Sequence, residues 1–121
     1  MVAAACILAT SMTQVGAPES AVVAAGAYRL QDHSLSIRGE TLTFHATVAA
    51  PEGESCWLRA WLSDEHRTLS EAVAQSHGSG TRVSIEVAVP PELTPGAYFA
   101  VVRIESRPLE TEHVVVFKLR V

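Results

Sequence analysis

The chain has 121 residues, of which 48% are hydrophobic and 18% are charged, and its formal net charge is −4. This length suggests a single domain, and the hydrophobic content is too high for a disordered chain. Because the charge balance is acidic and no run of basic residues occurs, we expect no nucleic-acid partner. No stretch reaches the roughly 18 apolar residues of a membrane-spanning helix, so no membrane span is expected.

Residues 1–20 form an apolar N-terminal segment that ends in a turn-forming cluster. A secretory signal peptide begins with basic residues, whereas the first basic residue here is Arg29. We therefore interpret residues 4–15 as a strand at the edge of a sheet, or as a strand donated to a neighbouring copy. The remainder of a truncated targeting segment is the alternative. Residues 21–121 are expected to form the domain itself.

Two strands are expected between residues 21 and 37. Residues 21–30 are rich in valine and alanine, and residues 35–37 start a second, shorter strand. The polar residues 31–34 between them interrupt the apolar pattern. The sequence therefore predicts that the first strand ends at this interruption.

The strand over residues 41–49 has the clearest pattern of the chain. It follows a tight turn at residues 38–40, in which Gly39 is free to adopt a positive φ. Apolar and polar side chains alternate along it, as in an antiparallel strand with one buried face and one solvated face. The apolar face comprises Leu42, Phe44, Ala46 and Val48.

Residues 56–62 form the strand on which the candidate site is centred. Successive side chains of a strand point to opposite faces. Trp57, Arg59 and Trp61 share one face, with the two indoles about 13 Å apart at roughly 3.3 Å per residue. Turning this face inward would bury Arg59 without an evident carboxylate partner, so it is expected to point outward. The inward face then comprises Cys56, Leu58, Ala60 and Leu62.

Four further strands complete the pattern. Residues 69–75 fit a short helix or a strand, and the strand is favoured because the surrounding segments are β. Residues 82–89, 97–105 and 113–121 alternate clearly. Their inward residues are Val83, Ile85, Val87, Val89, Tyr98, Ala100, Val102, Ile104, Val115, Phe117, Leu119 and Val121. Short strands with turn signals about every 8–12 residues predict an all-β fold, an antiparallel β-sandwich of seven or eight short strands.

Two stretches resemble elements of immunoglobulin-like and fibronectin type III-like sandwiches. Residues 93–102, Leu-Thr-Pro-Gly-Ala-Tyr-Phe-Ala-Val-Val, are similar to the Pro-Gly turn that enters the penultimate strand of those domains. Residues 38–44 resemble the turn into their second strand. The resemblance covers roughly residues 21–121 and implies an immunoglobulin-like sandwich. It also implies that Tyr98 packs across a corner, with its hydroxyl bonded to the backbone.

The cysteines depart from the pattern of antibody domains. Those domains place cysteines on the second and sixth strands and a tryptophan on the third. Here Cys56 adjoins Trp57, and neither strand expected to carry such a cysteine contains one, so the chain is not an antibody-type domain. Cys6 and Cys56 could pair in an oxidising compartment, but two buried thiols are the favoured interpretation. Modules with such a fold bind proteins, bind sugars, or act as spacers or subunits of assemblies.

No motif for catalysis, metal binding or cofactor binding is evident. The five histidines are scattered, and the spacings typical of metal-binding or nucleophile motifs are missing. Residues 63–66, Ser-Asp-Glu-His, bring three triad residue types together in sequence, but a triad needs convergence in space. A small enzyme is thus the least favoured alternative. We predict no catalytic residue, no cofactor and no metal site, including at His33, His45 and His113.

The candidate binding surface is the face that carries the two indoles. Its predicted binding residues are Trp57, Arg59, Trp61, Phe99 and Val101. Tryptophan and arginine are favoured anchors of protein interfaces. We hypothesise a non-catalytic module that binds a protein partner, which includes copies of itself. A carbohydrate-binding module that stacks sugars on the indoles is the alternative from another class. Coverage of the indoles by a loop over residues 64–80 is the structural alternative.

Overall fold

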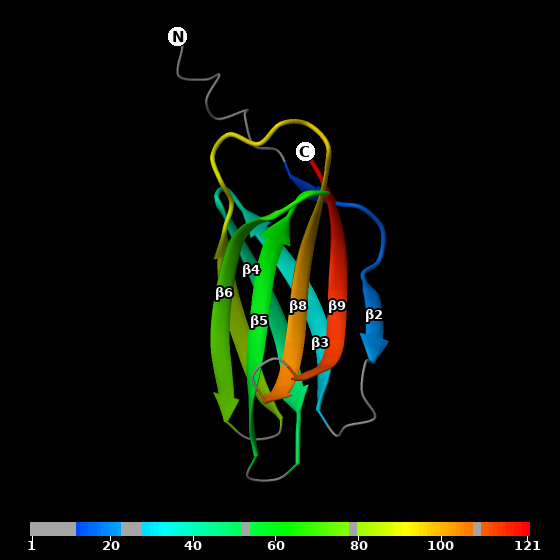
Figure 1. Cartoon of the computed structure of the whole chain (residues 1–121), viewed down its shortest axis with the longest axis vertical. Coiled ribbons are helices and arrows are strands. Elements are labelled where there is room, and N and C mark those ends of the chain that lie inside the picture. The colour runs from blue at the N-terminus through cyan, green and yellow to red at the C-terminus, as the bar shows by residue number, and fades with distance from the viewer. Residues whose placement is uncertain (1–11, 23–27, 52–53, 78–79, 108–109) are drawn as a thin grey trace.

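In the computed structural model the chain forms two antiparallel β-sheets packed face to face (Figure 1). The structure describes residues 12–22, 28–51, 54–77, 80–107 and 110–121. Within these ranges no helix has the length and apolar character needed to cross a membrane. The strands are β1 (Thr13–Gln14), β2 (Glu19–Val22), β3 (Arg29–Arg38), β4 (Thr41–Ala49), β5 (Ser55–Ser63), β6 (Thr68–His77), β7 (Thr81–Ala88), β8 (Ala97–Arg107) and β9 (Glu110–Arg120).

Sheet A has the strand order β9-β8-β5-β6, and both β1 and β2 pair with the other side of β9. Sheet B has the order β3-β4-β7. Every pairing is antiparallel. The prediction of an all-β antiparallel sandwich is therefore confirmed. Seven strands build the two layers, and the short β1 and β2 extend sheet A at one side.

The core lies between the sheets and uses the faces predicted from the alternation. Along β4 and β5, every second residue is buried and the others are only partly exposed. Phe44 of sheet B and Phe117 of sheet A meet across the core in an edge-on contact, with ring centroids 5.7 Å apart. Because a strand has a period of two, one apolar face per strand is enough to enclose this layer.

The strand break predicted at residues 31–34 is wrong. β3 runs from Arg29 to Arg38, and a register shift between Gln31 and Ser34 accommodates the polar residues. Asp32 adopts a φ of 49° there, which aspartate tolerates better than most residues. A β-bulge of this kind bends a strand without ending its pairing. The expected strand over 21–30 falls partly on residues 23–27, which lie outside the described residues.

Both N-terminal strands lie on sheet A. Thr13 and Gln14 pair with the end of β9, and Glu19–Val22 pair with its middle. The carboxylate of Glu19 lies 2.8 Å from the ammonium of Lys118 across this pairing. Residues 12–22 therefore belong to the edge of the sheet in their own chain. Residues 1–11, with Cys6 and most of the predicted strand over 4–15, lie outside the described residues.

Two local predictions are confirmed. Residues 69–75 belong to a strand, β6, as favoured from the sequence. Gly39 adopts a φ of 55° in the turn between β3 and β4. In addition, Tyr98 is buried at the start of β8, and its hydroxyl donates a hydrogen bond to the carbonyl oxygen of Thr94 at 2.6 Å. This is the backbone contact that the resemblance implied for Tyr98.

Candidate functional site

The strands that carry the predicted binding residues lie side by side in sheet A. The register places Trp61 beside Val101 of β8, and Val101 beside Val116 of β9. Arg59 lies beside Arg103 in the next outward-facing row. We call the side of these three strands that points away from the core the outer face, which comprises Trp57, Arg59, Trp61, Phe99, Val101, Arg103, Glu105, Val114 and Val116.

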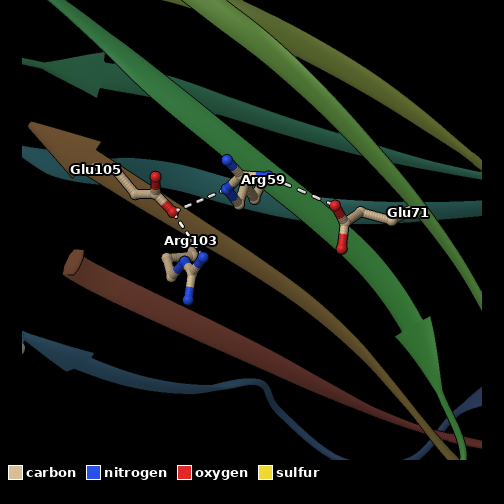
Figure 2. Close-up of polar contacts among 4 residues, drawn as sticks. All are labelled: Arg59, Glu71, Arg103 and Glu105. Carbon is tan, nitrogen blue, oxygen red and sulfur yellow. Dashed lines mark hydrogen bonds and ion pairs between the residues drawn. The ribbon is translucent and has the colours of Figure 1, made fainter. Parts of the chain in front are cut away.

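A buried carboxylate organises one end of the outer face. Glu105 is 0% exposed, and its Oε2 accepts a hydrogen bond from Arg59 Nε at 3.1 Å and lies 2.7 Å from a terminal nitrogen of Arg103. Arg59 also reaches Glu71 of β6, at 3.5 Å. Figure 2 shows these four side chains converging from three adjacent strands. A buried charge is costly unless it is paired, and here two guanidinium groups compensate it.

Arg103 also contacts an indole. Its guanidinium carbon lies 5.3 Å from the ring centroid of Trp61, within the range of a cation–π interaction. Arg103 therefore binds Glu105 and covers part of one face of Trp61 at the same time. Beside it lies an open hollow of about 400 Å³, lined by Arg59, Trp61, Thr68, Glu71 and Arg103.

The five predicted binding residues differ in their access to solvent. Trp57, Arg59, Trp61 and Phe99 are partly exposed. Val101 is only 8% exposed, so its neighbours on the face enclose it. Residues 68–77 lie beside β5 in the same sheet, as β6. They flank the indoles and do not lie over them, so these residues are not the covering loop that was the structural alternative for residues 64–80.

The ionic network of the outer face was not predicted from the sequence. Alternation leaves Arg103 and Glu105 on the side of residues 97–105 opposite the inward residues, but it does not link either of them to Arg59. The pairing of Arg59 with Glu105 joins residues 46 positions apart in the chain. The sequence contained one signal for it. An arginine and a carboxylate, two positions apart, fall on the outward side of the strand expected over residues 97–105. Only the register of β5 against β8 turns that signal into a contact.

His113 is a buried polar residue of β9 that ties β2 to β3 of sheet B. The Leu30 N–H donates to its Nδ1 at 3.0 Å, so the ring proton is on Nε2, which donates to Ser20 Oγ at 2.5 Å. Burial lowers the pKa of His113, and the nearby His33 and Arg29 act in the same direction. The ring is therefore suited to a neutral, structural role between β2, β9 and β3.

Other reactive residue types have local structural roles. Cys56 is a free thiol, and burial raises its pKa to about 11, which disfavours the nucleophilic thiolate. Asp64 Oδ1 accepts the backbone N–H groups of His66 and Arg67 at 2.7 and 2.9 Å, and these bonds lower its pKa. The carboxylate of Asp64, in the Ser-Asp-Glu-His stretch, thus closes a turn. Among the residues that the structure describes, no group of three or more His, Cys, Asp or Glu side chains could hold a metal ion.

His45 lies on the opposite surface of the molecule. It occupies the solvated face of sheet B, with Ser84 Oγ 3.1 Å from its Nδ1 and Ser36 Oγ 3.4 Å from its Nε2. Thr43 lies one row away on the same face. This polar surface contrasts with the aromatic and aliphatic outer face of sheet A.

Neither the known protein-family models nor the curated proteins give a match to this chain.

Proposed function

We propose that this protein is a non-catalytic β-sandwich module that binds a protein partner through the outer face of sheet A. The observation that carries the proposal is the presence of two partly exposed indoles and two paired arginines on one continuous strip of sheet. Tryptophan and arginine supply much of the binding energy of protein interfaces. The solvated face of sheet B carries mainly threonine, serine and charged residues.

The ionic network supports this proposal because it orders the arginines before any partner arrives. Arg59 and Arg103 are 26% and 25% exposed, and both are fixed by the enclosed Glu105. A side chain that is already ordered loses little conformational freedom on binding. The network therefore favours a rigid surface in which the ordered Arg59 lies between the two indoles of β5.

We also infer that the domain is immunoglobulin-like. If β3 to β9 are named A, B, C, C′, E, F and G, sheet B has the order A-B-E and sheet A the order G-F-C-C′. The immunoglobulin plan likewise has A, B and E in one sheet and G, F and C in the other, to which C′ can be added. The bond from Tyr98, at the start of the F strand, to an upstream carbonyl matches the tyrosine corner of that plan.

The test compares the stability of the isolated protein with its binding. Trp57→Ala and Trp61→Ala should each lower the free energy of unfolding by clearly less than the roughly 3–5 kcal/mol that a fully buried Trp would cost, because both indoles are partly exposed. A photo-crosslinker at position 99 identifies the partner, and titration calorimetry then measures its affinity. Each substitution should weaken binding by about 2 kcal/mol or more. Thr43→Ala, on the polar face of sheet B, is the control.

A large loss of stability together with unchanged partner binding would show that the indoles only hold the sandwich together.

The hollow beside Trp61 favours one second candidate, a carbohydrate-binding module. Its weakness is that Arg103 already covers part of the Trp61 ring that a sugar would stack on. Indole fluorescence is titrated with a panel of polysaccharides. A saturable change that Trp61→Ala abolishes would support the sugar and contradict the protein partner.

A further inference from the structure

We propose that two copies of this chain associate through the free edge of β6, to form one continuous antiparallel sheet across the dimer. β6 is the last strand of sheet A, and within the described residues only β5 forms a backbone ladder with it. At the start of β6, Ser70 Oγ donates a hydrogen bond to the Ala88 carbonyl oxygen of β7, so the open part of the edge is the stretch that follows. Figure 1 shows it at the side of the sandwich away from β9 and β2. The contact forms through the backbone edge of β6 and not through the outer face of β5, β8 and β9, although Val73 lies beside Arg59 on the same side of the sheet.

The other described sheet edges carry features that discourage pairing, whereas β6 carries few. β3 contains a bulge and three charged residues, and β7 contains Arg82 and Glu86. β9 is covered by β1 and β2, which are edge strands of only two and four residues. Natural proteins protect edges with charges, prolines, bulges or coverage. The sequence of β6, Thr-Leu-Ser-Glu-Ala-Val-Ala-Gln-Ser-His, has no proline and a single carboxylate.

The regular part of β6 is long enough to pair. Ser63 pairs with Thr68 and Leu62 with Ser70, so Leu69 is the extra residue of a bulge at the start of the strand. From Ser70 onwards the pairing with β5 is unbroken. Val73, in the middle of this part, is 45% exposed and is one of three large hydrophobic residues exposed among those described.

The side chains select one register for a two-fold symmetric pair. With Val73 opposite Val73 of the second copy, Glu71 lies opposite Gln75, which can donate a hydrogen bond to the carboxylate. Moving the centre to Glu71 would place two carboxylates opposite each other, which destabilises an antiparallel pair. Centring the pair on Ala72 would set Glu71 against Val73. In the register centred on Val73, the two valines therefore face each other, and each Glu71 carboxylate faces the polar side chain of Gln75.

Such a contact is one strand wide, which is smaller than the interfaces of permanent dimers. Association should thus be weak and concentration-dependent. Sedimentation velocity of the full chain, from roughly 10 μM to roughly 1 mM, measures it. We expect a monomer–dimer equilibrium for the wild type. Val73→Lys and Val73→Glu should each raise the dimer dissociation constant by at least about tenfold, because each places like charges across the two-fold axis.

The mixture of the two variants tests the register. In a mixed dimer the introduced lysine of one copy would face the introduced glutamate of the other across the two-fold axis. Opposite charges at directly opposed positions stabilise an antiparallel pair. An equimolar mixture should therefore regain the dimer, while each variant alone remains monomeric.

Val22→Lys, at a valine that is also 45% exposed but lies on β2, is the matched control and should leave the equilibrium unchanged. A wild type that is monomeric at every concentration overturns the proposal. A dimer that survives Val73→Lys, or a mixture that stays monomeric, overturns it as well. At roughly 10 μM, where the weak dimer is dissociated, the Val73 and Val22 variants should keep the wild-type melting temperature, because both valines are exposed. A dimer lost in Trp61→Ala but kept in Val73→Lys would assign the contact to the outer face and overturn the edge.

Discussion

At the scale of single residues, Glu105 determines the order of the outer face. Glu105→Gln keeps the size of the side chain and removes its charge. We expect the free energy of unfolding to fall by about 3 kcal/mol, because Arg59 and Arg103 lose the carboxylate that compensates them in a partly desolvated site. Urea denaturation followed by circular dichroism measures the change.

Glu71→Gln is the matched control for this prediction. Glu71 also pairs with Arg59, but its side chain is half exposed. An exposed ion pair contributes little, so this variant should lose less than about 1 kcal/mol. Similar losses for the two variants would contradict the view that burial makes Glu105 the centre of the network.

Tyr98 provides a second test at this scale. Tyr98→Phe removes a hydroxyl that donates to the Thr94 carbonyl from a buried ring. The expected loss is about 1 kcal/mol, the typical net contribution of one hydrogen bond. It should appear as a lower midpoint of urea unfolding. Tyr28→Phe, which removes an exposed bond to Glu54, should leave the midpoint in place. An unchanged midpoint for Tyr98→Phe would mean that the corner bond adds nothing to stability.

The buried His113 predicts how stability depends on pH. Its pKa in the folded chain is below the ordinary value of 6.5, chiefly because the ring is buried. As the pH falls through 6.5 the unfolded chain binds a proton at this position while the folded chain does not. This contribution to stability is therefore complete above pH 6.5 and is lost progressively below it.

Denaturation midpoints measured between pH 5 and 8 test this prediction. His113→Asn keeps an acceptor near the Nδ1 position for the Leu30 N–H but cannot titrate. Its stability should fall less steeply below pH 6.5 than that of the wild type. His66→Gln, on an exposed turn, is the control. If wild type and His113→Asn have parallel profiles, then His113 is not a source of the acid sensitivity.

At the scale of elements, β1 and β2 protect the edge of β9. Deleting residues 1–22 removes both strands and the ion pair between Glu19 and Lys118. We expect lower stability, together with new association through the bare edge of β9. Deleting residues 1–11 alone keeps both strands and is the control. Equal stability and equal mass in solution for the two truncated chains would contradict a protective role.

The elements that the sequence predicted best are those with a strict period of two. β4 and β5 lie where alternation places them, since one apolar face per strand is all that the sandwich requires. β3 was split in error, because polar residues at a bulge look like a strand end when only the pattern is considered. The pattern states which side of a strand is apolar, but it does not state whether pairing continues through a bulge.

The candidate site was predictable only in part for a similar reason. Alternation placed Trp57, Arg59 and Trp61 on one side of β5, and the register with β8 then places them beside Val101 and its neighbours. The bond between Arg59 and Glu105 depends on that register, which is set by long-range pairing. Alternation also indicates direction and not exposure, so the near-complete burial of Val101 on an outward side was not foreseen.

At the scale of the whole molecule, the two sheets should unfold as one unit because they share a single core. The chain provides two probes for this. Both tryptophans lie on β5, so indole fluorescence reports on sheet A, whereas far-ultraviolet circular dichroism reports on both sheets. We expect the two signals to give coincident unfolding curves in urea.

The contact between Phe44 and Phe117 tests the same coupling directly, since it joins β4 of sheet B to β9 of sheet A. Phe44→Leu and Phe117→Leu should each destabilise the protein by about 1–2 kcal/mol. The double variant should lose less than the sum, with a coupling energy of about 0.5–1.5 kcal/mol for an aromatic pair. Strictly additive losses, or a fluorescence transition that separates from the dichroism transition, would mean that the sheets are stabilised independently. In that event the outer face of sheet A would owe its order to its own ion pairs and not to the core behind it.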